Sequence, residues 1–141
     1  MKIIFADKYD SLLSMIVPVV QPPVKFSQQN QHETFKTIKW GDIVLTGDKG
    51  LKMVEWSSFF PVNKPFYTFV EHGSLRNGEE YKTFLEEHAE IPFRLIITEN
   101  FKTKFNSLVV IDSFEYEYDK VGDIAYSLKL MEFPEDGTGT I

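Results

Sequence analysis

Two runs of alternating apolar and polar residues constrain the fold of this chain more than any other feature of the sequence. The first run covers 108–118, the second covers 124–131, and Asp-Lys-Val-Gly at 119–122 separates them. Alternation with a period of two is typical of strands that bury one face, because successive side chains point to opposite sides of a sheet. The short connection favours an antiparallel hairpin and so predicts a sheet-rich domain.

Shorter β-rich segments precede this hairpin along the chain. The residues expected to form strands are 3–5, 24–28, 35–40, 43–46, 51–59 and 93–98. Segment 9–20 fits either a strand or a hairpin arm. The sequence Gly-Asp-Lys-Gly at 47–50 predicts a turn, because glycine tolerates positive φ, and hence a second hairpin of 43–46 with 51–59. The alternation at 24–28 predicts a half-buried strand.

One segment has the period of a helix. It opens at 77 or 78, and its apolar face carries Tyr81, Phe84, Leu85 and His88 at positions i, i+3, i+4 and i+7. On such a face His88 is expected to pack rather than to act as an acid, a base or a ligand. With about seven strands and one helix, the chain is assigned to the α+β class, dominated by antiparallel sheet. We expect one domain over 1–133 and a flexible tail over 134–141.

Charge and composition exclude several classes of function. The chain has 15 Lys plus Arg against 21 Asp plus Glu, a net charge of −6 and a pI of about 5.1. This balance argues against nucleic-acid binding, which depends on clustered cations. The absence of cysteine excludes disulfide frameworks, thiol catalysis and cysteine-based zinc sites. No apolar run reaches the ~20 residues that span a bilayer, so we expect a soluble protein without membrane insertion.

A search for catalytic motifs finds little chemistry. The chain contains no G-x-S-x-G, no P-loop and no G-x-G-x-x-G. The least poor candidates for an enzyme are Asp112, His72 and Glu71, and no further ligand stands at metal-binding spacing from the last two. Glu115 and Glu117 share one strand face, where a solvated surface explains them better than an acid–base pair. We therefore expect no catalytic residue, no cofactor and no metal.

Aromatic residues are the one unusual feature of the composition. The chain has 13 Phe, 6 Tyr and 2 Trp, which together make 15% of its residues, and they concentrate at 56–69 and 114–126. In the first region they fall on both faces of a strand end, which fits either a packed core or an exposed edge that binds a partner protein. The residues proposed to bind a partner are Trp56, Ser58, Phe59, Phe60, Pro61, Phe66 and Tyr67.

Short motifs spread over 24–133 carry a family resemblance. They are GDIVLTGDKGLK at 41–52 with SSFFP at 57–61, PFRLIIT at 92–98, and VIDSFEY at 110–116 with GDIAYSLKL at 122–130 and Glu132. In order and spacing these motifs resemble the N-terminal domain of the XkdP-like family. Its members are LysM-containing tail and baseplate proteins of contractile phages and defective prophages.

The resemblance implies a structural component of a tail baseplate that joins the central hub or tube to the surrounding wedge proteins. It also implies several copies in a symmetric particle, assembly in the bacterial cytoplasm and no catalysis. The chain reaches Ile141 before any Y-x-V-x-x-G-D-T-L-like opening, so glycan binding through LysM is not implied. The alternative function is a β-domain that binds a glycan or small ligand by stacking on Trp40, Trp56 and the tyrosines.

Overall fold

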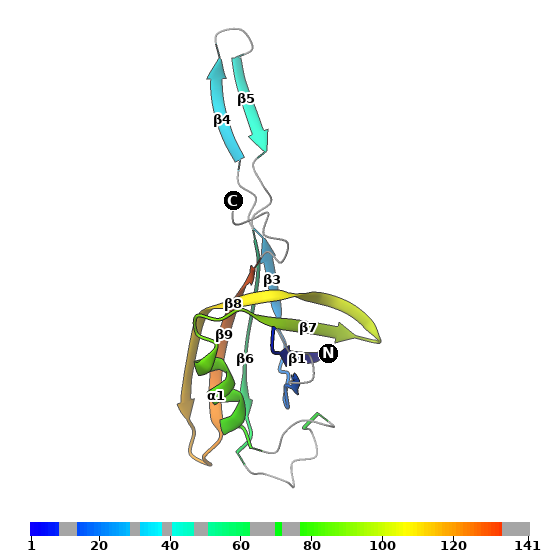
Figure 1. The fold of residues 1–141 in the computed structure, drawn as a ribbon, viewed down its shortest axis with the longest axis vertical. Helices are drawn as coiled ribbons and strands as arrows, with labels where there is room; N and C mark the ends of the chain where they lie inside the picture. Colours follow the sequence, from blue (N-terminus) through cyan, green and yellow to red (C-terminus); the bar gives the residue numbers. More distant parts are fainter. Residues whose placement is uncertain are drawn as a thin grey trace.

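The computed structural model of the protein describes residues 1–8, 14–28, 32–37, 41–46, 51–62, 70–71 and 77–133, with the backbone alone at 32–37 and 41–46. Antiparallel strands dominate these residues, with one helix among them (Figure 1). In chain order the elements are β1 (Lys2–Ala6), β2 (Ser14–Ile16), β3 (Lys25–Gln28), β4 (His32–Thr37), β5 (Gly41–Thr46), β6 (Lys52–Phe60), α1 (Glu79–Glu87), β7 (Phe93–Glu99), β8 (Lys102–Tyr118) and β9 (Ile124–Phe133).

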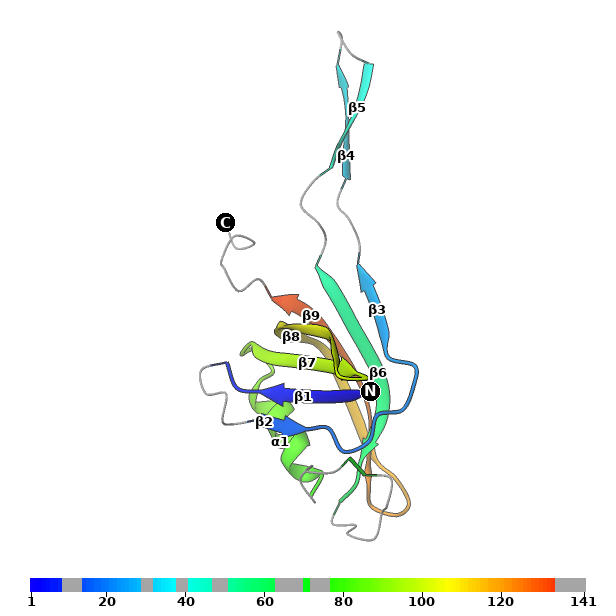
Figure 2. The same cartoon turned by 90° about the vertical axis from the view of Figure 1, so that its right-hand side faces the viewer.

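Seven of the strands form one antiparallel sheet. Their order is β2-β1-β7-β8-β9-β6-β3, and β4 pairs with β5 in a separate two-stranded sheet. In Figures 1 and 2 the two-stranded sheet lies apart from the large one. A seven-stranded antiparallel sheet with one helix confirms the predicted α+β class.

The longest strand, β8, joins two halves of the large sheet. Its residues up to Val109 pair with β7, and its residues from Leu108 onward pair with β9. The register with β9 shifts between Ile111 and Ser113, and such a bulge bends a strand. The strands β1 and β7 consequently cross β6 and β9 at a steep angle, as Figure 2 shows. The predicted hairpin of 108–118 with 124–131 is confirmed.

Alternation along β6 and β9 determines which side chains enter the core. The paired residues that face inward are Ile124, Tyr126, Leu128 and Leu130 of β9 with Phe60, Ser58, Trp56 and Val54 of β6. The Phe60 ring stacks on Tyr126 with centroids 4.0 Å apart. The intervening residues, such as Ser57 and Ser127, lie on the outer, solvent-exposed face.

The helix α1 covers this core with the face that the sequence predicts. Tyr81 and Leu85 are fully buried, and His88 is 9% exposed. Phe84 stacks on Phe5 of β1 with ring centroids 5.8 Å apart, which binds the helix to the β1–β7 half of the sheet. Gly78 precedes the first helical residue, in agreement with the predicted start.

Two predictions about the segment from β3 to β6 are wrong. The hairpin of 43–46 with 51–59 does not form, because β5 pairs with β4 while β3 and β9 occupy the two sides of β6. The turn expected at 47–50 lies outside the described residues. The strand β3 is exposed along its whole length, with Phe26 41% exposed, because it lies at the edge of the sheet. The strand expected at 35–40 is β4, which ends at Thr37.

The N-terminal segment, which fits two structures by sequence, forms the short edge strand β2 and then an extended connection. The Tyr81 hydroxyl donates a hydrogen bond to the carbonyl of Ile16. Ser58 Oγ donates another to the carbonyl of Val19 over 2.8 Å. The first bond holds the end of β2 against α1, and the second holds the connection against β6.

Candidate interaction surface

Most of the described residues proposed to bind a partner are buried inside the chain itself. The buried ones are Trp56, Ser58, Phe60 and Pro61. Phe59 lies on the opposite face of β6 and is only partly buried. Phe66 and Tyr67 lie outside the described residues. The structure therefore gives the four buried residues a packing role, and partner binding by this segment stays a prediction that depends on the other three.

A buried hydrogen bond fixes Trp56 within the core. Its Nε1 donates to the Tyr126 hydroxyl over 2.8 Å. Burial raises the pKa of Tyr126 well above its ordinary value, and the hydrogen bond from Trp56 opposes that rise. Because Trp56 is only 3% exposed, its ring offers no free face on which a sugar could stack. Trp40, the other tryptophan of the glycan-binding alternative, lies outside the described residues.

The residues considered as candidates for catalysis or metal binding contact other parts of the protein or lie outside the described residues. Asp112 is exposed on β8, with its Oδ2 3.9 Å from Lys129 Nζ. His88 stacks on the Phe84 ring, with centroids 4.0 Å apart, which confirms the predicted packing role. His72 lies outside the described residues. The backbone N–H of Glu71 donates a hydrogen bond to the carbonyl of Pro18. Within the described ranges, no group of three or more His, Asp or Glu side chains could hold a metal ion.

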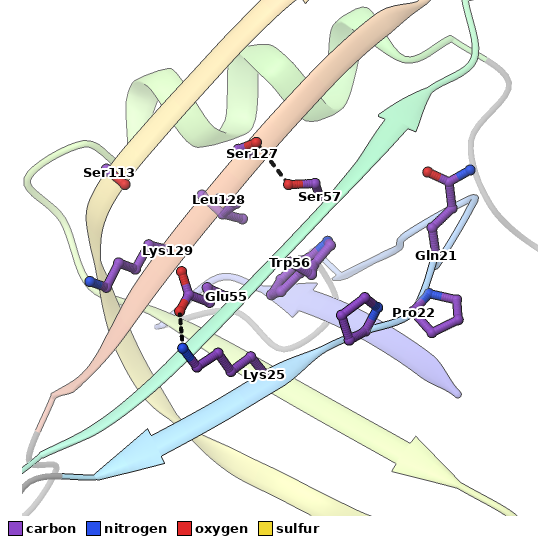
Figure 3. A pocket seen from close by; sticks show the side chains of 11 residues that line it. Gln21, Pro22, Lys25, Glu55, Trp56, Ser57, Ser113, Ser127, Leu128 and Lys129 are labelled. Carbon is purple, nitrogen blue, oxygen red and sulfur yellow. Dashed lines mark hydrogen bonds and ion pairs between the residues drawn. The ribbon is translucent and has the colours of Figure 1, made fainter.

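An open groove of about 890 Å³ crosses the outer face of β6 and β9 (Figure 3). Its lining residues are Gln21, Pro22, Pro23, Lys25, Glu55, Trp56, Ser57, Ser113, Ser127, Leu128 and Lys129. Ser57 and Ser127 hydrogen-bond across the strands at 2.8 Å, and Lys25 Nζ lies 3.6 Å from Glu55 Oε1. Since the polar groups already pair with each other, the groove resembles a hydrated sheet face more than a ligand site.

The C-terminal end of strand β8 contacts the helix α1 through two tyrosines, Tyr116 and Tyr118. The Tyr118 hydroxyl donates to Glu79 Oε1 over 2.8 Å, and the Tyr116 hydroxyl donates to Glu86 Oε2 over 3.3 Å. Lys82 Nζ lies 5.4 Å and 5.9 Å from the two ring centroids, in cation–π range. The bond from Tyr118 is the main reason that the pKa of Glu79 lies below its ordinary value. These exposed rings therefore serve the fold.

Among the described residues, the most exposed aromatic one is a residue that sequence patterns gave no reason to single out. Asn100 and Phe101 form the two-residue turn between β7 and β8, with φ of 53° and 64°, and the Phe101 side chain is fully exposed. Turns with two positive φ values strongly prefer glycine, and phenylalanine is strained there. The only local signal is Asn100, since asparagine favours turns whereas phenylalanine favours strands. We call Asn100 and Phe101 the hairpin tip.

A smaller hollow of about 390 Å³ lies where β2 meets α1. Its apolar residues are Met15 and Phe84, and its remaining lining residues are Thr83, Glu79, Glu80 and Glu87. Phe84 is held by its stacking on Phe5, so this part of the apolar lining is fixed before anything binds. We call this site the acidic hollow.

Comparison with known proteins finds a sequence relative and a structure with a similar fold. No protein-family model matches the chain. It is 28% identical over 121 residues to the uncharacterized protein YqbP of Bacillus subtilis (strain 168), which is 83% of this chain and 53% of YqbP. The chain thus spans about half the length of that relative. It shares its fold with a chain from the C6-symmetric tail of an empty GTA (gene transfer agent) particle, at 15% identity and a TM-score of 0.55, over 94% of this chain and 91% of that one.

In the described part of the chain, no helix has the length and apolarity needed to cross a bilayer.

Proposed function

We propose that this chain is a structural subunit of a phage-like tail, present in several copies around the tail axis. The observation that carries the proposal is the fold shared with a chain of a C6-symmetric GTA tail, which covers 94% of this chain and 91% of that one. Coverage this extensive relates the two chains over most of their lengths rather than through one common motif. The sequence motifs that resemble tail and baseplate proteins support the same conclusion independently.

A finer proposal follows from the family resemblance. We infer that the subunit sits in the baseplate, where it joins the central hub or tube to the surrounding wedge proteins without catalysing a reaction. The large sheet supports such a role with its edge strands β2 and β3, whose outer sides pair with no other described strand, because edge strands offer backbone groups to a neighbouring chain. His88 packs on the Phe84 ring and Asp112 lies within ion-pair distance of Lys129, which suits a structural protein.

Deletion of the gene tests the tail role. Particles purified from the host before and after deletion are compared by electron microscopy, and mass spectrometry checks whether the protein is present in the particles. We expect the protein in wild-type particles, and tails without a complete baseplate after deletion. Complete, unchanged tails after deletion, or absence of the protein from wild-type particles, would refute the proposal.

A point variant tests the predicted partner-binding segment separately. Phe59→Ala removes a partly exposed ring on the outer face of β6, so we expect a folded protein that enters particles less efficiently. Ser57→Ala on the same exposed face is the matched control and should enter particles normally. Equal incorporation of both variants would remove Phe59 from the interface.

A further inference from the structure

The hairpin tip combines an exposed aromatic ring with a strained backbone, and neither property stabilises the isolated protein. Phe101 is fully exposed, so its ring contributes nothing to the core, and its φ of 64° lies in the left-handed region that disfavours a large side chain. An exposed aromatic ring held in a strained turn is typical of a binding anchor.

The charges beside the tip indicate the chemistry of its partner. Lys102 and Lys104 follow Phe101 on β8 and are exposed, and the exposed Glu99 of β7 pairs in register with Lys102. None of the three forms an ion pair with a described residue, so two lysines stand against one glutamate beside the tip. A matching site would be an apolar pocket with an acidic rim. A site of matching composition lies on this same chain, because the acidic hollow is lined by the partly buried Met15 and Phe84 together with three glutamates.

The charges of the hollow are available for such a contact. Glu79 is occupied by Lys82 and Tyr118, whereas Glu80 and Glu87 are exposed and form no ion pair with a described residue. The hollow's volume of about 390 Å³ lies within the range of pockets that bind small molecules, so it has room for one aromatic side chain.

The tip cannot reach the hollow of its own chain. Phe93, at the start of β7, packs edge-on against Phe84 of α1, and the tip follows the far end of that strand. A strand of this length spans about 20 Å. Both views show β7 running from beside α1 to the opposite side of the molecule (Figures 1 and 2). The two surfaces can therefore meet only between copies, head to tail.

We propose that Phe101 of one copy inserts into the acidic hollow of the next copy, with Lys102 and Lys104 facing Glu80 and Glu87. Head-to-tail contacts of this kind generate rings when the rotation closes. The inference rests on the proposed tail role, and the symmetry of the related GTA tail fits a ring of six copies.

The natural absence of cysteine makes disulfide trapping a direct test. The double variant Phe101→Cys with Thr83→Cys places thiols at the tip and in the hollow, too far apart to join within one chain. In oxidised particles purified from the host, we expect a ladder of linked copies that collapses to monomer on reduction. Either single variant should give nothing larger than a dimer.

A mismatched pair provides the control. The variant Phe101→Cys with Ser113→Cys places one thiol at the tip and the other on the exposed outer face of the sheet. Because the proposed contact does not bring these two positions together, we expect no ladder of linked copies. A ladder from this pair, or no ladder from the first pair in particles that contain the protein, would overturn the inference and leave the tail role standing. Particles that lack wild-type protein would instead refute the tail role itself.

Charge reversal and a photo-crosslinker identify the partner. In the Phe101→Cys with Thr83→Cys background, Lys102→Glu with Lys104→Glu should weaken the ladder of linked copies. Glu80→Lys with Glu87→Lys should weaken it equally. Combining the two charge-reversed pairs should restore the ladder. In competition with wild type, Phe101→Ser should enter particles about tenfold less. A photo-crosslinking phenylalanine analogue at position 101 should label peptides that contain Met15 or Phe84. Labelling of a different protein, or failure of the combined charge variant to recover, would overturn the inference.

Discussion

Replacing Phe101 by glycine should stabilise the isolated protein although it removes an aromatic ring. A residue other than glycine in the left-handed region costs about 1–2 kcal/mol, and φ at Phe101 is 64°. The ring is fully exposed, so its removal sacrifices little burial. Glycine makes the unfolded chain more flexible, which offsets about 0.4–1 kcal/mol of the gain. The expected net effect is about 0.5–1 kcal/mol of added stability, or a rise in Tm of about 2–3 °C.

Thermal and urea denaturation followed by circular dichroism measure this effect. Phe101→Ala is the matched control, because alanine keeps the Cβ and with it the backbone strain, so its Tm should stay near that of wild type. Gly122→Ala provides the converse change at a φ of 87°, where an added Cβ meets nothing within 4 Å. Strain alone should then cost about 1 kcal/mol. If Phe101→Gly lowered the Tm, the ring would have a stabilising role in the monomer and the strain reasoning would be wrong.

The remaining predictions concern the core. Gly78→Ala places a Cβ 2.6 Å from Phe60 Cβ and 2.7 Å from the Pro61 carbonyl oxygen, so it should cost about 1–3 kcal/mol in urea unfolding, and an unchanged midpoint would contradict that geometry. Tyr126→Phe leaves the buried Nε1 of Trp56 without its acceptor and should cost about 1–3 kcal/mol at neutral pH. The pKa of Tyr126 is raised on folding, so its stability contribution is complete below the unfolded pKa of about 10 and is lost as the pH rises above that value. Unfolding between pH 8 and 11 should therefore show a smaller alkaline loss of stability in Tyr126→Phe than in wild type, and equal losses would contradict the raised pKa.

The parts of the fold that sequence patterns predict are those governed by local periodicity. The hairpin of β8 with β9 and the buried face of α1 both follow from spacing along one segment. The pairing of β6 depends instead on competition between distant strands. Its partners β3 and β9 exclude β5 from either side, and no spacing within 41–60 records that outcome.

The candidate interaction residues show the same limit. Aromatics occupy both faces of β6 near its end, and the register with β9 decides that Trp56 and Phe60 turn inward while Phe59 turns outward. Composition thus identifies an excess of aromatic side chains without placing them. Phe101 escapes notice for a different reason, because its only local signal is the turn preference of Asn100, which does not indicate a positive φ at the phenylalanine itself.

The energies at the hairpin tip explain how a strained, exposed phenylalanine could persist in an assembly protein. Burial of one aromatic side chain removes about 150–250 Å² from water, which at ~25 cal/mol per Å² corresponds to about 4–6 kcal/mol before the cost of ordering the interface is subtracted. The left-handed conformation costs about 1–2 kcal/mol in the monomer. The free energy of backbone strain is therefore smaller than the free energy gained when the side chain is buried between copies in the assembly. The strained turn also fixes the direction of the Phe101 side chain before it binds. Stability and assembly should respond oppositely to Phe101→Gly, and a residue that served only the monomer could not produce that pair of results.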